Sequence, residues 1–195
     1  MPDAIFNHGN PLTGVPSILA LRDLRRRMQV YLCDRSSEVR GQAWTSMLRI
    51  DPLAVVRGLR VANARVYDFH PERWTIQGLA ERLGSTLVPR LLNTPALPTY
   101  DTGELRQLWL HAVATAHAAR DLATETGLLD PEEAYLLGLV QDLPAWLRQI
   151  QELRGVSALA TPESRAAWIR HWNLPPSITA IALQPLQLPT AATAK

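Results

Sequence analysis

Cysteine is almost absent from this chain of 195 residues, because Cys33 is the only one. A single cysteine excludes an intramolecular disulfide and any zinc or iron–sulfur site built from cysteine ligands. Long apolar runs are missing too, since the longest are about the length of residues 135–140, far short of the roughly 18 to 20 residues that span a bilayer. The first residues also lack the basic and then apolar order of a signal peptide. We therefore expect a cytoplasmic protein with no membrane partner.

An excess of charge of one sign is missing as well. The 20 basic side chains stand against 18 acidic ones, a formal net charge of +2, and Lys195 is the only lysine. Proteins that bind nucleic acid through its phosphates usually carry a stronger and more clustered basic charge, so we do not expect a nucleic-acid partner. The short motifs of P-loop, serine-hydrolase and zinc-protease chemistry are also absent from the sequence. None of these common enzyme classes is therefore favoured.

What the chain does contain is helical periodicity. Hydrophobic residues make up 47% of the sequence, enough for the core of one domain or at most two. No segment with alternating polarity between turn residues predicts a strand. We therefore predict an all-α, multi-helix bundle of about nine to eleven helices. Residues 17–186 are expected to form a single domain, with 1–16 as a lead-in and 187–195 as a tail.

Short polar, proline and glycine signals mark where the predicted helices start and stop. Asp51-Pro52 and Asp130-Pro131 each combine an N-cap carboxylate with a proline at the first helical position. Gly84 is suited to end a helix in a left-handed conformation, and Ser177 is predicted to cap the last helix. Alanines on one face of the longest predicted helix, 104–126, favour a close approach to another helix. The other predicted helices cover 17–32, 36–50, 52–64, 76–83, 86–92, 131–143, 145–153, 162–172 and 178–183.

Four groups of residues occur in an order that is typical of one protein family. They are Asp51-Pro52 with LRVANA at 59–64, LWLHA at 108–112, GLVQDL at 138–143, and WNLP at 172–175 with AIALQP at 180–185. In this order and spacing the chain resembles the HDOD family, the HD-related output domain, over about residues 16–186. The resemblance implies an all-α fold related to the HD phosphohydrolases and a regulatory role in bacterial signal transduction.

The positions that depart from the family pattern matter most for function. His111 and Asp142 match the family's histidine on the central helix and the aspartate of its His-Asp pair. The histidine of that pair is replaced by Gln141, and the two later histidines are replaced by Leu183 and Gln184. A catalytic divalent metal needs at least about three good protein ligands. The resemblance, with these replacements, therefore implies no metal site, no cofactor and no catalytic residues.

Asp142 is expected in the partly buried middle of the bundle, where an unpaired carboxylate is costly. A hydrogen bond or ion pair from His111 would satisfy both groups. The predicted remnant of the HD site, a candidate pocket, consists of His111, Gln141, Asp142 and Gln184. Three arginines at helical spacing offer another partner for Asp142, or a surface that holds a phosphate or contacts a partner: Arg57, Arg60 and Arg65.

We expect a non-catalytic signal-transduction module that binds a protein partner or a small signalling ligand such as a nucleotide. Two alternatives stay open. A divergent, metal-dependent phosphohydrolase of HD type would need ligands from other positions, for example His117, Asp121 or Glu133. A nucleic-acid or nucleotide binder would use the arginine surface, and its binding would weaken strongly with salt. The six tryptophans invite stacking with bases, but their helical positions predict packing in the core or an interface.

Overall fold

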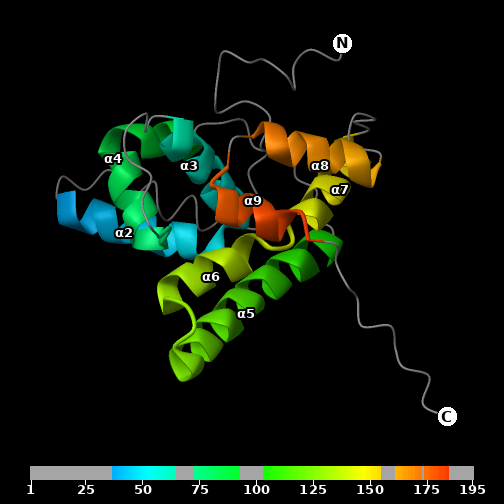
Figure 1. Ribbon diagram of the computed structural model, residues 1–195. Helices are drawn as coiled ribbons and strands as arrows, with labels where there is room; N and C mark the ends of the chain where they lie inside the picture. Colours follow the sequence, from blue (N-terminus) through cyan, green and yellow to red (C-terminus); the bar gives the residue numbers. More distant parts are fainter. Residues whose placement is uncertain (1–36, 65–72, 93–102, 155–160, 173, 185–195) are drawn as a thin grey trace.

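The computed structural model describes residues 37–64, 73–92, 103–154, 161–172 and 174–184, which are helical with short connections (Figure 1). The prediction of an all-α fold is confirmed for this part of the chain. Eight helices lie in it: α2 (Ser37–Ile50), α3 (Pro52–Ala64), α4 (Ile76–Leu92), α5 (Gly103–Thr126), α6 (Pro131–Val140), α7 (Leu143–Arg154), α8 (Pro162–His171) and α9 (Pro176–Ala182).

The predicted number of nine to eleven helices is too high for the described residues. The two helices predicted over 76–83 and 86–92 share the label α4, but they are separated by a kink at Gly84 (φ 58°, ψ 178°). Gly84 has the positive φ that glycine adopts without strain, and its backbone is not helical, so it ends the first helix of α4 as predicted, and the second predicted helix follows across the kink. The predicted helix at 17–32, the lead-in 1–16 and the tail 187–195 lie outside the described residues.

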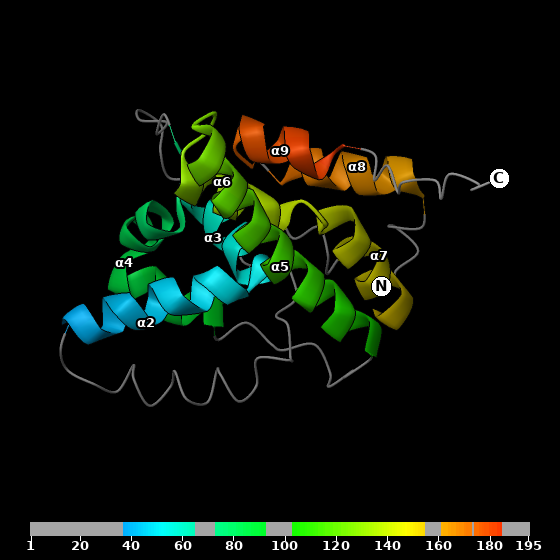
Figure 2. The same cartoon turned by 90° about the horizontal axis from the view of Figure 1, so that it is seen from below.

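The helices form two groups joined by an α5–α6 hairpin. Figure 1 shows α2, α3 and α4 on one side and α7, α8 and α9 on the other, with α5 and α6 running beneath both groups. Viewed from below, α5 lies nearest the viewer across the face of the molecule (Figure 2). This arrangement places one long face of α5 against the bundle and leaves the opposite face outside it.

The α5–α6 contact depends on small residues, as the alanine pattern predicts. Ala112, Ala116 and Ala123 are the alanines buried on α5. A Cβ atom added to Gly138 of α6 would lie 2.9 Å from the Ala116 Cα and 3.0 Å from the Thr115 carbonyl oxygen. Because real side chains do not approach a backbone so closely, only glycine fits at residue 138 with the helices at this separation.

The core is centred on α3, which packs against α2, α4 and α6. Residues 52–59 of α3 are all buried, including the charged Arg57. The core also contains aromatic side chains from other segments, as predicted for the tryptophans: Trp74, Tyr135, Trp146 and Trp172 are each at most 5% exposed. Within the described residues, none of the helices combines the length and the apolar character needed to cross a membrane.

Most predicted helix starts are confirmed, and one cap is wrong. Asp51 Oδ1 accepts a hydrogen bond from the Ala54 N–H at 2.9 Å, and Asp130 Oδ1 accepts from the N–H groups of residues 132 and 133. Ser177, predicted as the cap of the last helix, instead lies in the first turn of α9, which begins at Pro176 after Pro175 as N-cap. A proline at the first helical position lacks an N–H group and has its φ preset, so this helix starts without a side-chain cap.

Candidate functional site

The centre of the candidate site is a hydrogen bond between His111 of α5 and Asp142 in the turn between α6 and α7. His111 Nδ1 lies 2.5 Å from Asp142 Oδ2. The Asp142 side chain is only 4% exposed, whereas that of His111 is 60% exposed. The prediction that His111 satisfies the buried carboxylate is therefore confirmed.

The local sequence explains why Asp142 is buried. The turn that holds Asp142 lies between two buried residues. They are Val140 at the end of α6 and Leu143 at the start of α7, and each is 1% exposed. The Asp142 carbonyl oxygen accepts hydrogen bonds from the N–H groups of Ala145 at 2.9 Å and Trp146 at 3.1 Å. Asp142 therefore starts α7 with its backbone while its side chain reaches α5.

The hydrogen bond also sets the chemistry of the exposed imidazole. An ionised carboxylate only accepts hydrogen bonds, so the proton between the two groups belongs to His111 Nδ1. In the neutral ring this leaves Nε2, on the opposite side of the imidazole, as a hydrogen-bond acceptor. His111 is thus a fixed polar group at the surface, held in one tautomer by a buried carboxylate.

The other two residues of the predicted remnant do not join this pair. Gln141 is half-buried at the C-cap of α6, and Gln184 is exposed after the end of α9. Among the described residues, neither glutamine side chain hydrogen-bonds to His111 or Asp142. Leu183, at the other later histidine position, packs against the core cluster. Of the four residues of the predicted remnant, only His111 and Asp142 are therefore joined to each other by a hydrogen bond.

The residues present do not fit the divalent metal site of an HD phosphohydrolase. One carboxylate and one imidazole are available, and they are hydrogen-bonded to each other. Within the described residues, no group of three or more histidine, cysteine, aspartate and glutamate side chains is arranged to hold a metal ion. Neutral amides such as Gln141 and Gln184 are weak replacements for imidazole ligands. We therefore derive no catalytic step through a metal.

The structure describes two of the three arginines proposed as a phosphate surface, and these two do not form an exposed pair. Arg57 is 2% exposed and lies in the core. Arg60 is half-buried, and its desolvation lowers the pKa of the guanidinium from its ordinary value. Arg65 lies outside the described residues. Their spacing on the sequence suggests an exposed face, but Arg57 lies in the core and Arg60 is half-buried, because neighbouring helices pack against α3.

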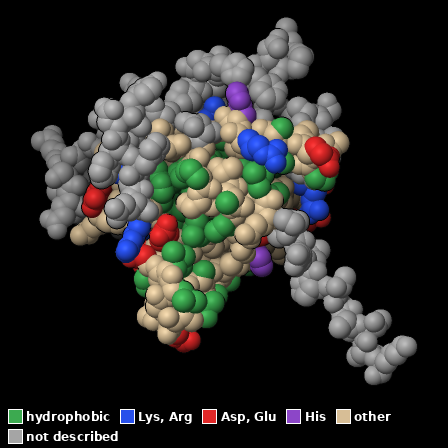
Figure 3. All heavy atoms as spheres, viewed as in Figure 1, with side chains coloured by type: hydrophobic (Ala, Val, Ile, Leu, Met, Phe, Trp, Pro, Cys, Tyr) green, Lys and Arg blue, Asp and Glu red, His purple; other side chains and the backbone are tan. Residues whose placement is uncertain are grey.

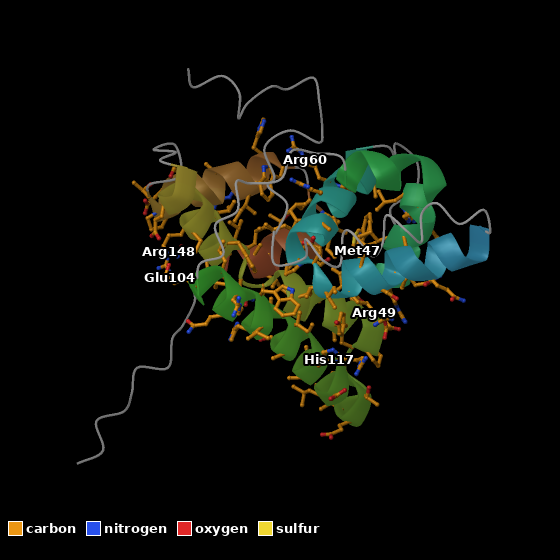
Figure 4. All side chains as sticks on the ribbon, turned by 180° about the vertical axis from the view of Figure 1, so that it is seen from behind. Met47, Arg49, Arg60, Glu104, His117 and Arg148 are labelled. Atoms are coloured by element: carbon orange, nitrogen blue, oxygen red, sulfur yellow. The ribbon has the colours of Figure 1, made fainter. Side chains whose placement is uncertain are left out.

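A second polar cluster surrounds Tyr135 of α6, and the sequence does not predict it. The Tyr135 hydroxyl donates to the Arg49 carbonyl oxygen at 2.8 Å, and burial raises the pKa of this phenol. The guanidinium carbons of Arg49 and Arg120 lie 5.4 Å and 5.7 Å from the centre of its ring. His117 packs edge-on against the same ring at 5.2 Å. Figure 4 shows Arg49 and His117 on the same side of the molecule.

Two residues that the phosphohydrolase alternative would need as ligands, His117 and Asp121, lie next to Arg120 of this cluster. His117 Nδ1 lies 3.2 Å from Arg120 NH2, and since a guanidinium only donates, the imidazole is the acceptor. Asp121 is exposed and lies 3.5 Å from Arg120. Desolvation, with the nearby charge of Asp130, raises the pKa of Glu133 on α6. The structure does not bring His117, Asp121 and Glu133 together as a metal site.

The comparisons with known proteins place most of these residues within one family model. A model described as the HDOD domain matches residues 20–152. The match includes His111, Gln141 and Asp142 and ends before α8, α9 and the two residues that follow α9, Leu183 and Gln184. Searches of curated proteins and of solved structures found no match.

Proposed function

Since the chain belongs to the HDOD domain family, a signalling-associated group of HD-related domains, we propose that it is a non-catalytic regulatory module that binds a protein partner or a small signalling ligand. The observation that carries this proposal is the hydrogen bond between His111 and Asp142. These two residues occupy positions that match HD metal ligands, and here they bond to each other. The setting we propose is the cytoplasm, where the single Cys33 would remain reduced.

Two physical arguments favour binding over catalysis. His111 and Asp142 could not both ligate one ion while they are hydrogen-bonded, because the free Nε2 lies on the side of the imidazole opposite Asp142, and a 4% exposed carboxylate has little access to ions from solvent. Gln141 cannot replace the missing imidazole as a ligand of comparable strength. A binding module needs neither change, because an oriented imidazole at the surface can accept a hydrogen bond from a partner as it stands.

The proposed contact surface is centred on His111. Its side chain is 60% exposed, and Asp142 fixes its ring from the buried side. Holding the ring before binding reduces the conformational entropy lost on association. A ligand that donates a hydrogen bond to Nε2 would match this surface, whether it is a peptide group or a sugar hydroxyl.

The experiment that tests the proposal combines metal binding with hydrolysis. The purified protein is titrated with Mn²⁺, Fe²⁺, Mg²⁺ and Zn²⁺ by calorimetry, and each mixture is assayed with a chromogenic phosphodiester. We expect no stoichiometric ion and no turnover above that of the ion alone. Saturable, metal-dependent hydrolysis that is lost in Asp142→Asn would refute a non-catalytic function and support the phosphohydrolase alternative.

A second arm tests binding directly. Partners are captured from a bacterial lysate with the wild-type protein, His111→Ala and the control Thr124→Ala, an exposed change on the same helix. A specific partner is expected with the wild type and the control and is expected to be lost with His111→Ala. A single-stranded oligonucleotide serves as the probe for the nucleic-acid alternative. Binding of this probe that weakens steeply with salt would favour that alternative instead.

A further inference from the structure

The imidazole of His111 presents a nucleophilic nitrogen at the surface. The described residues contain three histidines, and all three are exposed: His111, His117 and His171. Figure 3 shows histidine side chains, in purple, at the surface of the molecule. The Nδ1 atom of His111 donates its proton to Asp142 Oδ2, which leaves the in-plane lone pair of the neutral ring on Nε2. Such a nitrogen can form a covalent bond to an electrophile.

His117, six positions later on α5, has the opposite arrangement. Its Nδ1 accepts a hydrogen bond from Arg120 NH2 at 3.2 Å. In the neutral ring the proton therefore lies on Nε2, and the in-plane lone pair is already engaged with the guanidinium. Two exposed imidazoles on the same helix thus differ in reactivity. His111 can form a new bond at Nε2 as it stands, whereas His117 must first give up its contact with Arg120.

We propose that Nε2 of His111 is a phosphorylation site, which accepts an activated phosphoryl group from a donor that carries phosphorus on nitrogen or on a carboxylate oxygen. The product has a positively charged ring and a negatively charged phosphoryl group. His111 suits both charges, because a buried carboxylate faces one side of its ring and solvent reaches the other. This inference goes beyond the proposed function, since it concerns covalent modification of the residue at the centre of the contact surface.

The bonding changes of this transfer fit the pair of His111 and Asp142. The Nε2 lone pair forms the N–P bond, while the bond from phosphorus to the donor atom breaks and its electron pair stays with the leaving group. A carboxylate leaves as the anion, and a nitrogen leaving group takes a proton from water. His111 keeps its proton on Nδ1, so its ring becomes positively charged. Asp142 Oδ2, at 2.5 Å from Nδ1, stabilises this charge as it develops.

The surroundings of His111 leave room for a phosphoryl group. The side chain is 60% exposed, so the phosphoryl oxygens can be hydrated. The positions one helical turn away on the same face of α5 are all uncharged: Gln107, Leu108, Ala114 and Thr115. None of these four residues therefore repels the phosphoryl oxygens as a carboxylate would.

Phosphoramidate and acetyl phosphate are the probes, because they carry phosphorus on nitrogen and on a carboxylate oxygen respectively. The full chain is incubated with each donor and Mg²⁺ at about pH 8, where an ordinary histidine is neutral. Intact mass spectrometry follows the uptake of phosphoryl groups, and ³¹P NMR distinguishes Nε2-phosphohistidine from Nδ1-phosphohistidine. We expect phosphorylation at Nε2 of His111 from at least one donor, at a rate at least about tenfold above that at His117. The product should be absent in His111→Ala.

The matched control is His117→Ala, which removes the other exposed imidazole of α5 and should be phosphorylated within about twofold of the wild-type rate. Asp142→Asn retains the size of the side chain but not its charge, and should slow the reaction at least about tenfold. Asp142→Ala releases Nδ1, so Nδ1-phosphohistidine should now form as well. A purely structural role of Asp142 would not change which nitrogen reacts. Far-UV circular dichroism checks that each variant is folded.

Three results would overturn the proposal. The first is the absence of phosphohistidine with both donors. The second is an equal rate at His111 and His117, because exposure and not the position of the lone pair would then decide the reaction. The third is a wild-type protein that captures a partner through His111 but takes up no phosphoryl group, which would overturn this inference alone and leave the proposed function intact.

Discussion

Removing the imidazole of His111 gives the sharpest test of the site. In His111→Ala, the buried Asp142 carboxylate loses its donor at 2.5 Å. Breaking a fully buried ion pair costs about 3 to 5 kcal/mol, and losing one hydrogen bond to a charged group costs about 1.5 to 3 kcal/mol. Because the His111 side chain is 60% exposed, water can enter the space that it leaves. The lower range applies, and we expect a loss of about 2 kcal/mol in the free energy of unfolding.

A double-mutant cycle separates this hydrogen bond from other effects of the substitutions. Urea unfolding is measured for the wild type, His111→Ala, Asp142→Asn and the double variant, followed by circular dichroism. The two side chains should be coupled by about 1 to 2 kcal/mol, since each loses its value when the other is absent. Thr124→Ala, on the exposed side of α5, is the control and should couple to Asp142→Asn by less than about 0.3 kcal/mol. A coupling between residues 111 and 142 as small as this would show that the hydrogen bond does not form in solution.

Three further predictions concern the packing and charge of α6. Gly138→Ala should lower the free energy of unfolding by about 1 to 2 kcal/mol in urea, because the new Cβ would lie 2.9 Å from the Ala116 backbone and this overlap outweighs the roughly 1 kcal/mol gained in helix propensity. An unchanged or higher stability would mean that α5 and α6 separate freely. Tyr135→Phe should cost about 1 kcal/mol in the same assay, because the Arg49 carbonyl oxygen loses its donor at 2.8 Å. Glu133→Gln should raise the melting temperature slightly at pH 7 and leave it unchanged at about pH 3. Desolvation raises the pKa of the Glu133 carboxyl in the folded state. The folded protein therefore favours the protonated form and loses stability as the pH rises through that pKa. A gain at pH 3 as large as that at pH 7 would contradict this cause.

The parts of the fold that the sequence predicts are those decided by neighbouring residues. Asp51-Pro52 and Asp130-Pro131 start helices because a cap and a proline act within one turn. Ser177 has the right residue type for a cap, but the prolines before it start α9 one residue earlier. Gly84 has the expected positive φ and separates the two helices within α4, because glycine adopts this conformation without strain.

The parts that the sequence does not predict depend on contacts between distant segments. The hydroxyl of Tyr135 and the carbonyl of Arg49 are separated by 86 positions in the chain, and no local pattern links them. Arg57 shows the same limit, because helical spacing alone does not reveal that other helices cover the face on which it lies. The contact of His111 with Asp142 was predictable because two arguments agreed: the family resemblance aligned both residues, and the cost of a buried carboxylate required a partner.

The position of Asp142 gives the surface at His111 a direct connection to the inside of the protein. The side chain of Asp142 holds the imidazole on α5, and its carbonyl oxygen accepts the N–H groups of Ala145 and Trp146 at the start of α7. A ligand that pulls His111 away from Asp142 therefore acts on the residue that starts α7, and Trp146, with 1% exposure, carries that change into the core. On the other side of Asp142, α6 is held to α5 by the close contact of Gly138 with Ala116 and cannot easily shift. A change at His111 should therefore reach α7 before it reaches α6, and hydrogen exchange of the α7 amides in His111→Ala should increase more than that of the α6 amides.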